Sequence, residues 1–294
     1  MEAQLRERGR TIVKSCDLHV HSNYSDGTYT PAEIISSAVE ARLTAVALCD
    51  HNTVDGLPDF LAAAEGADIA AIAGAEFSVD YGGRELHLLG LFIPCESFSK
   101  VTDLMRDVNN RKEASNVQLI ESLNRAGYEI SYERIKASTP SGNFNRAHIA
   151  AELTRMGYTN SVKHAFDTLL YPDAGHYTEP KRLSVWDMLD FIRDIGAVPV
   201  LAHPFLSLNE NDLDLFLPKA KKRGLVGLEC LYSTYDEATT NKAFELANKY
   251  ELLYSGGSDF HGDNKPDIAL GVGKGNLVIP FEWVEKLQES SARN

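Results

Sequence analysis

Short apolar runs alternate with helix-length segments along most of the chain. Seven runs have the length of buried strands, namely TIVKSCDLHV (11–20), TAVALCD (44–50), DIAAIAGAEFSV (68–79), ELHLLGLFI (85–93), AVPVLAHP (197–204), GLVGLEC (224–230) and ELLYSGGSD (251–259). Mainly apolar runs of this kind are typical of strands that are covered on both faces. Their alternation with helical segments predicts an α/β fold with a parallel sheet or barrel.

The connecting segments carry helix signals. TPAEIISSAVEARL (30–43) opens with a Thr-Pro start signal, and VWDMLDFIRDIG (185–196) ends on a glycine. The strand-helix rhythm stops after Pro94 and resumes near Gly196, with helix-like stretches such as KVTDLMRDVNNRKEASNVQLIESLNRAG between them. We therefore predict a discontinuous barrel over 12–96 and 184–280, a helical insertion over 97–183 that caps the substrate, and a C-terminal helix or tail over 281–294.

The composition is that of a folded globular protein. The chain has 294 residues, 44% hydrophobic and 24% charged, which is enough for one large core with a smaller appended unit. Its four cysteines lie far apart without a CxxC pair, which argues against a disulfide framework or zinc ribbon and favours a reducing compartment. No stretch has the apolar pattern of a signal peptide or a membrane span, so we expect a cytoplasmic protein without membrane contact.

The charge balance limits the class of partner. A net charge of −13 disfavours binding to long nucleic acids. A small phosphorylated substrate is still compatible with this charge, provided that local cations or metals receive it. The sequence leaves the oligomeric state open.

The segment DLHVHSNYSDG (17–27) places His19 and His21 at the end of an apolar run. Residues i and i+2 of a strand point to the same face, so both imidazoles can bind one metal ion. Asp26 follows in a turn-prone stretch and can bring an oxygen ligand to the same pocket. On its own, the pair would more simply be two solvent-facing strand histidines.

The next two runs also carry chemistry. His51 follows Asp50 at the carboxyl end of a strand, where α/β barrels gather their catalytic residues. Asp50 can orient a neighbouring imidazole, although an Asp-His pair in a loop is more often structural. Glu76 lies in the apolar run IAAIAGAEFSV, where a carboxylate is costly unless a metal compensates its charge. Its two oxygens can bridge two cations, as two-metal hydrolysis requires.

Three further histidines and an aspartate follow the same pattern. His87 lies in ELHLLGLFI, His203 ends VPVLAHP, and Asp259 and His261 repeat the i, i+2 spacing in SGGSDFH. A lone histidine on an apolar strand is more often a hydrogen-bonded core residue, but six of the nine histidines fall on or just after predicted strands. This concentration favours a shared metal centre, and mixed imidazole and carboxylate ligands suit zinc, iron or manganese.

In this order, HxHxxxSDG, the DH pair, the buried GxE, the AHP element and the SDFH element resemble the PHP (polymerase and histidinol phosphatase) family. The resemblance covers residues 16 to about 95 and 196 to about 275. It implies a distorted (β/α)7 barrel with two or three divalent metal ions, Mn, Zn or Fe, at the carboxyl ends of the strands. By that likeness the first metal binds His19, His21, Glu76 and Asp259, the second binds Glu76, His87 and His203, and the third binds Asp26, His51 and His261.

These ligands predict a metal-dependent phosphoester hydrolase. Bridging cations lower the pKa of a bound water, and the resulting hydroxide attacks phosphorus while the metals neutralise the phosphoryl oxygens. Asp259 or a ligand histidine such as His203 then moves the proton to the leaving oxygen, and the sequence does not choose between them.

Cationic residues of the insertion are candidates for binding the substrate phosphate. Arg146 and His148 lie in NFNRAHIAAEL, and Lys163 lies in SVKHAFDTLL. Arginine offers a fork matched to phosphate oxygens and lysine a point charge, although solvated helix residues would show the same spacing. The RxHxA pattern resembles the insert of PHP members that dephosphorylate nucleoside 3',5'-bisphosphates. The chain then departs from that pattern with YPDAGHYTEPKR, in which His176 is a further candidate.

The substrate is therefore open between a nucleoside 3',5'-bisphosphate and a ribose cyclic phosphate, which related PHP proteins with a similar insert hydrolyse. A 5'-3' exonuclease on short oligonucleotides and a histidinol-phosphate-type monophosphatase are the alternatives. A metal-dependent amidohydrolase fits less well because it usually lacks the SDG and DFH elements. A non-enzymatic polymerase-associated module would belong to a much longer chain or have a basic surface.

Overall fold

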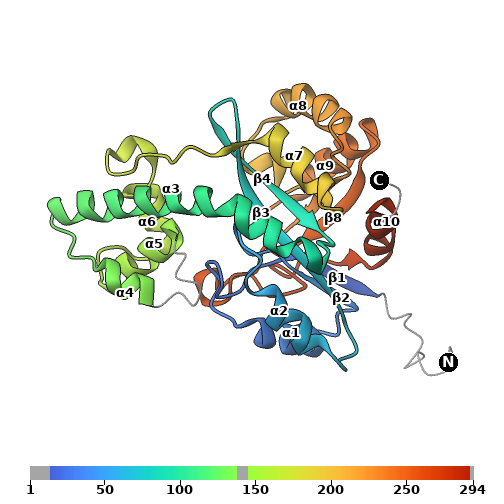
Figure 1. Cartoon of the computed structure of the whole chain (residues 1–294), viewed down its shortest axis with the longest axis horizontal. Helices are drawn as coiled ribbons and strands as arrows, with labels where there is room; N and C mark the ends of the chain where they lie inside the picture. The colour runs from blue at the N-terminus through green and yellow to red at the C-terminus, as the bar shows by residue number, and fades with distance from the viewer. Residues whose placement is uncertain (1–13, 138–144, 292–294) are drawn as a thin grey trace.

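The strands of the chain form one curled sheet (Figure 1). The computed structural model describes residues 14–137 and 145–291. Its strands are β1 (Ser15–Val20), β2 (Ala45–Leu48), β3 (Ala70–Tyr81), β4 (Arg84–Leu91), β5 (Leu183–Ser184), β6 (Val198–Leu201), β7 (Gly227–Tyr232), β8 (Leu253–Gly257) and β9 (Ile279–Pro280). The sheet order is β8-β7-β6-β4-β3-β2-β1-β9, and β5 pairs with β3. A bridge between Val20 and Phe260 brings the end of β1 beside the end of β8, so the sheet nearly closes. The predicted α/β barrel is confirmed.

Two strands depart from the expected parallel arrangement, namely the short β9, which pairs antiparallel with β1, and the longer β4. β4 runs antiparallel to both β3 and β6. The reason is the two-residue turn Gly82–Gly83, whose φ angles of 62° and 84° suit glycine and produce a hairpin. β4 therefore begins at the end of the sheet where the parallel strands finish, and its His87 pairs with Ser78 of β3.

Helices cover the sheet on both faces. They are α1 (Pro31–Glu40), α2 (Leu57–Ala64), α3 (Phe98–Arg125), α4 (Tyr132–Ala137), α5 (Arg146–Arg155), α6 (Val162–Thr168), α7 (Val185–Asp194), α8 (Glu210–Lys222), α9 (Glu237–Lys249) and α10 (Glu282–Ser291). The expected start of α1 is present, because Thr30 and Glu33 form a capping box and Pro31 occupies the first turn. Helices α1, α2, α7, α8 and α9 pack on one face of the sheet in the largest core cluster.

The final helix, α10, packs against the opposite face. Trp283 and Leu287 join Leu18, Leu89 and Val200 in a separate core inside the curled sheet. This is the ordinary packing expected for their helical spacing, and α10 lies where the sequence predicts a C-terminal helix or tail. Among the described residues, no helix is long and apolar enough to cross a membrane.

Helices α3 to α6 occupy the segment for which the sequence predicts an insertion. The long α3 reaches from the barrel to α4, α5 and α6, which gather on the side of the molecule away from α10 (Figure 1). They share a small core that includes Leu119, Leu153 and Ala165. Whether 97–183 behaves as a separate unit stays a prediction.

The closure of the barrel depends on a glycine and a buried aspartate. A Cβ on Gly257 would lie 2.1 Å from Cβ of His19, so only glycine lets β8 approach β1 this closely. The Asp17 carboxylate accepts hydrogen bonds from the backbone nitrogens of Ser258 (2.8 Å) and Gly271 (2.8 Å). The joint between β1 and β8 thus sets the position of His19 relative to Asp259.

Candidate metal centre

Nine side chains that the sequence singles out come together at one end of the barrel. They are His19 on β1, His21 and Asp26 after it, His51 after β2, Glu76 on β3, His87 on β4, His203 after β6, and Asp259 and His261 after β8. All are buried except His51 and His87, which are partly exposed. His87 reaches the site from the beginning of its strand, because β4 is antiparallel. His87 thus differs from the arrangement at the carboxyl ends of the strands that the resemblance implies for the metal centre as a whole.

Glu76 lies at the middle of the cluster. Its Oε1 is 2.7 Å from Nδ1 of His87 and 2.9 Å from Nε2 of His203. Its Oε2 is 3.3 Å from Nε2 of His19, 3.3 Å from Nε2 of His21 and 3.0 Å from Nδ1 of His51. Burial alone would raise the pKa of Glu76, but the surrounding imidazoles hold it well below its usual range. The carboxylate is therefore ionised. Its Oε1 faces His87 and His203, and its Oε2 faces His19, His21 and His51.

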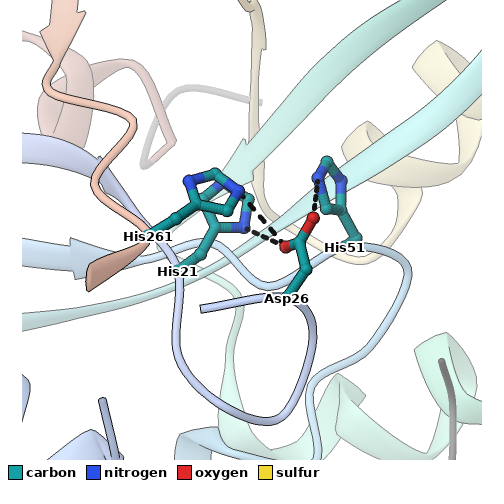
Figure 2. Close-up of side chains that lie close together, drawn as sticks. All are labelled: His21, Asp26, His51 and His261. Carbon is teal, nitrogen blue, oxygen red and sulfur yellow. Dashed lines mark ion pairs between the residues drawn. The ribbon is translucent and has the colours of Figure 1, made fainter. Parts of the chain in front are cut away.

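Asp26 organises a second part of the cluster (Figure 2). Its Oδ1 lies 3.2 Å from Nε2 of His261 and 3.8 Å from Nδ1 of His21, and its Oδ2 lies 3.6 Å from Nε2 of His51. The amide of Asn145, which caps α5, donates to Oδ2 at 2.9 Å. Asp26 thus joins three histidines of the barrel to the N-cap residue of α5.

Distances divide the cluster into groups that could each hold a cation. Within each group the ligand atoms lie within 4.8 Å of one another, and the groups are His21, Asp26, His51 and His261; His19, Glu76 and His203; His19, His21 and Asp259; and His51, Glu76 and His87. Asp26, His51 and His261 stay together as the family resemblance implies. Oε1 of Glu76 faces both His87 and His203, the set that the resemblance implies for the second metal, and the overlapping groups also bring His203 beside His19 and His87 beside His51.

Unsatisfied atoms test whether the cluster suits metal ions. Nε2 of His19, Nε2 of His21, Nδ1 of His51 and Oδ1 of Asp26 are buried without a hydrogen-bond partner among the described residues. Buried polar atoms of this kind are costly unless another ligand satisfies them. All four belong to the groups above, and imidazole with carboxylate is a common donor set for divalent zinc, iron or manganese. The residues present therefore fit divalent cations.

A carboxylate that the sequence reasoning does not single out supports two of the histidines. Glu229 on β7 is fully buried, and its Oε1 lies 3.1 Å from Nδ1 of His19. Its Oε2 accepts a hydrogen bond from the backbone nitrogen of His203 at 2.7 Å. The signal was present, because Glu229 interrupts the apolar run GLVGLEC as Glu76 interrupts its own run.

The backbone at two of these positions is in the left-handed region. His203 has φ 27° and Asp259 has φ 56°, values that residues other than glycine rarely adopt. The hydrogen bond from His203 to Glu229 and one from the nitrogen of Asp259 to the oxygen of His19 (2.8 Å) hold these conformations. Such strain often occurs where a fold fixes functional side chains.

Two residues fix the Asp259 side chain. Its Oδ2 accepts hydrogen bonds from the hydroxyl of Tyr232 (2.7 Å) and from Nζ of Lys265 (2.6 Å), while Oδ1 faces His21 at 3.2 Å. Burial would raise the pKa of Asp259, but Lys265 and the histidines hold it well below its usual range. Asp259 is therefore a fixed, ionised carboxylate.

Asp50 has a different position from the one expected. It accepts hydrogen bonds from Ser22 N (2.8 Å), Ser22 Oγ (2.6 Å) and Ser25 Oγ (2.5 Å). Rather than contacting an imidazole directly, it holds the SNYSDG turn. That turn presents Asp26 to the cluster.

A cavity of about 190 Å³ opens beside the cluster, and we call it the cationic pocket. Asp26, His51 and His87 line it together with the cations Lys112, Arg146, Lys181 and Arg182. Glu85 is the counterion, since its Oε2 lies 2.7 Å from Nη2 of Arg182 and 3.6 Å from Nη2 of Arg146. The guanidinium of Arg146 also lies over the ring of Tyr177, 4.2 Å from its centroid. Four cations against two carboxylates make this pocket positive in a negatively charged protein.

The other candidate substrate residues are placed differently. His148 completes the capping box of α5 with Asn145, and Nδ1 of His176 lies 2.9 Å from Oγ of Ser122, so each has a structural partner. Lys163 is exposed, pairs with Asp167, and lines a second cavity instead. Lys112 lines the cationic pocket without having been singled out from the sequence, and Lys181 and Arg182, which line it too, stand out there only as part of the departing segment YPDAGHYTEPKR.

Comparison with known proteins places these features in a family context. The PHP domain model matches residues 17–194. The phosphoribosyl 1,2-cyclic phosphate 1,2-diphosphodiesterase of Eggerthella lenta is 30% identical, covering 84% of this chain and 94% of that protein. The 3',5'-nucleoside bisphosphate phosphatase of Chromobacterium violaceum (87% and 91% covered) and a 5'-3' exoribonuclease of Haemophilus influenzae (85% and 91%) are each 28% identical.

A solved structure shares the fold. A candidate metal-dependent phosphoesterase from Bifidobacterium adolescentis superposes with a TM-score of 0.84 at 23% identity, over 94% of this chain and 96% of that one.

Proposed function

Because this chain belongs to the PHP domain family and is a metal-dependent phosphoester hydrolase, we propose that its substrate is a small phosphorylated metabolite with a second phosphate. A nucleoside 3',5'-bisphosphate and a ribose cyclic phosphate that carries a further phosphate both meet this description. The two relatives named for such substrates support the proposal. We further propose two or three bound divalent ions, Mn, Zn or Fe.

The observation that carries the proposal is the shared wall between the metal cluster and the cationic pocket. Asp26, His51 and His87 belong to both. A substrate with one phosphate at the cluster can place another against Arg146, Arg182 and Lys112. Arginine pairs well with phosphate because its fork forms two parallel charge-assisted hydrogen bonds.

The roles of the protein residues follow from their positions. Divalent ions bound by the nine ligands would supply an activated water and neutralise charge on the phosphoryl oxygens. Glu76 and Asp26 hold the histidines of the metal cluster in place, and Glu229 orients His19. Asp259 or His203 would move the proton to the leaving oxygen.

The test compares substrates with and without the distal phosphate. We expect kcat/KM for adenosine 3',5'-bisphosphate to exceed that for adenosine 3'-monophosphate by about 10- to 100-fold, because a charge-assisted hydrogen bond contributes roughly 1.5–3 kcal/mol. Arg146→Ala should remove most of this preference. Arg125→Ala, at an exposed arginine near the end of α3, is the matched control. Equal kcat/KM for the two substrates would contradict the proposal.

A further inference from the structure

Two adjacent residues at the start of α5 contact the barrel. Asn145, the N-cap residue of the helix, donates a hydrogen bond from its side-chain amide to Oδ2 of Asp26 at 2.9 Å. Nη2 of Arg146, the next residue, lies 3.6 Å from Oε2 of Glu85 in the cationic pocket. One turn of the insertion therefore reaches both the metal cluster and the pocket beside it.

The helix fixes the orientation of the Asn145 amide. Its Oδ1 accepts hydrogen bonds from the backbone nitrogens of Ala147 (2.9 Å) and His148 (3.4 Å). Exchanging the two ends of the amide would turn Nδ2 toward these N–H groups and the oxygen toward the Asp26 carboxylate. Only the observed orientation gives hydrogen bonds on both sides. The Asn145 side chain is buried, so these contacts are shielded from water.

The contact sets the direction of the Asp26 carboxylate. Asn145 holds its Oδ2, whereas its Oδ1 is buried without a hydrogen-bond partner among the described residues and lies 3.2 Å from Nε2 of His261. Oδ1 therefore remains open to a cation. Carboxylates that bind metals are usually held in this way by a hydrogen bond from a neighbouring group.

The identity of the cap residue points to this second role. Asparagine, aspartate and serine cap helices about equally well. Aspartate would place a second carboxylate against that of Asp26. The hydroxyl of serine is one bond closer to the backbone than the amide of asparagine, and the helix already engages it. Among the three, asparagine combines an acceptor for the helix with a donor that reaches Asp26.

On the basis of the divalent ions in the proposed function, we propose that Asn145 is a positioning residue for the metal bound by the group of His21, Asp26, His51 and His261. All four candidate ligands belong to the barrel, so the insertion completes a metal site to which it contributes no ligand. Without the contact, Asp26 is free to turn, and the affinity for that metal falls while α5 stays folded. The insertion thus supports metal binding in addition to the binding of substrate phosphate.

The test replaces Asn145 by another good cap residue. Asn145→Ser keeps an acceptor for the helix but removes the donor to Asp26. In calorimetric titrations with manganese, one binding step should weaken by about 10-fold, the lower end of the range for losing a residue that supports a metal ligand. Asp26→Asn should weaken the same step, which assigns that step to the group that contains Asp26.

Asn209→Ser is the matched control. Asn209 caps α8 by accepting a hydrogen bond from the backbone nitrogen of Asp212, and its amide donates to Oδ2 of the same aspartate at 2.8 Å, outside the metal cluster. This variant should keep the manganese affinity of the unaltered protein. Chemical denaturation of the metal-free proteins should give similar midpoints for Asn145→Ser and Asn209→Ser, because both keep a serine cap.

Unchanged manganese affinity in Asn145→Ser, or an equal loss in Asn209→Ser, would overturn the inference. A loss of affinity together with a much lower denaturation midpoint in Asn145→Ser alone would also overturn it, because Asn145 would then act only through the stability of the helix. Normal manganese binding without hydrolysis of adenosine 3',5'-bisphosphate would count against the proposed function alone, because these binding constants require no turnover.

Discussion

The carboxylate of Glu229 lies 3.1 Å from Nδ1 of His19, and both side chains are fully buried. This contact holds Nδ1 and turns Nε2 toward Glu76 at 3.3 Å in the metal cluster, and Nε2 is one of the buried atoms without a hydrogen-bond partner among the described residues. A carboxylate behind a histidine ligand is a common way to fix the ring and raise its basicity toward a metal. Glu229 therefore connects the barrel core to the metal cluster.

Replacing Glu229 tests this connection. Glu229→Gln keeps the size of the side chain but removes the charge that orients His19. We expect the affinity for manganese or zinc to fall by about 10- to 100-fold, the usual effect of losing such a partner. Metal titration followed by calorimetry measures it. Glu245→Gln, at an exposed position on α9, should leave the affinity unchanged, and an equal loss in both variants would argue against a specific role.

Metal binding should release protons at neutral pH. Burial alone would lower the pKa of His87, but Glu76 outweighs it and raises this pKa to about 10. Burial likewise opposes protonation of His21, and Asp259 and Glu76 raise its pKa to about 9. At pH 7 both imidazoles therefore carry a proton in the metal-free protein, and a metal must displace it.

The sign of the pH dependence follows. Metal affinity should increase as the pH rises from 7 toward 9 to 10, where the imidazoles lose their protons without assistance. Calorimetric titration at pH 7 in two buffers of different ionisation enthalpy should show a release of about three protons on full loading, because Glu76 and Glu229 outweigh burial and also raise the pKa of His19 well above its usual range. No proton release would mean that these histidines are neutral before the metal binds.

Gly257 should tolerate no side chain. A Cβ there would lie 2.1 Å from Cβ of His19, so Gly257→Ala must displace β8 or β1. We expect a loss of about 1–3 kcal/mol in the free energy of unfolding, as for other overpacked cores, together with weaker metal binding because His19 moves. Chemical denaturation measures the first effect and metal titration the second. Gly66→Ala, where φ is 79° but nothing lies within 4 Å, adds backbone strain without a steric contact and should leave metal binding unchanged.

Much of the candidate site could be predicted because several of its residues lie within a few positions of one another in the sequence. His19 on β1 and His21 directly after it keep the two-residue repeat of a strand, and the sequence displays that spacing directly. Asp259 and His261 have the same spacing but follow β8, where the left-handed backbone of Asp259 helps to place them. The direction of β4 was also readable, since two adjacent glycines between apolar runs favour a tight hairpin. The expectation of a parallel sheet did not take these two glycines into account.

The residues of the cationic pocket were harder to predict from the sequence, for a physical reason. Lys112 lies on α3, where a lysine in an amphipathic helix looks like any solvated residue until the helix folds over the barrel. His176 illustrates the reverse case, because its hydrogen bond with Ser122 depends on a residue 54 positions away. Contacts that form only when the insertion folds against the barrel or onto itself produce no regular spacing in the amino-acid sequence.

The most direct test of the account is phosphate release before and after metal removal. We expect protein stripped by a chelator to lose hydrolysis of adenosine 3',5'-bisphosphate, and added manganese, zinc or iron to restore it. His21→Ala, which removes an imidazole shared by two of the four groups, should remain inactive after metal is added. Hydrolysis that continues in fully stripped protein, or no hydrolysis of any phosphoester with any of these metals, would contradict the central claim.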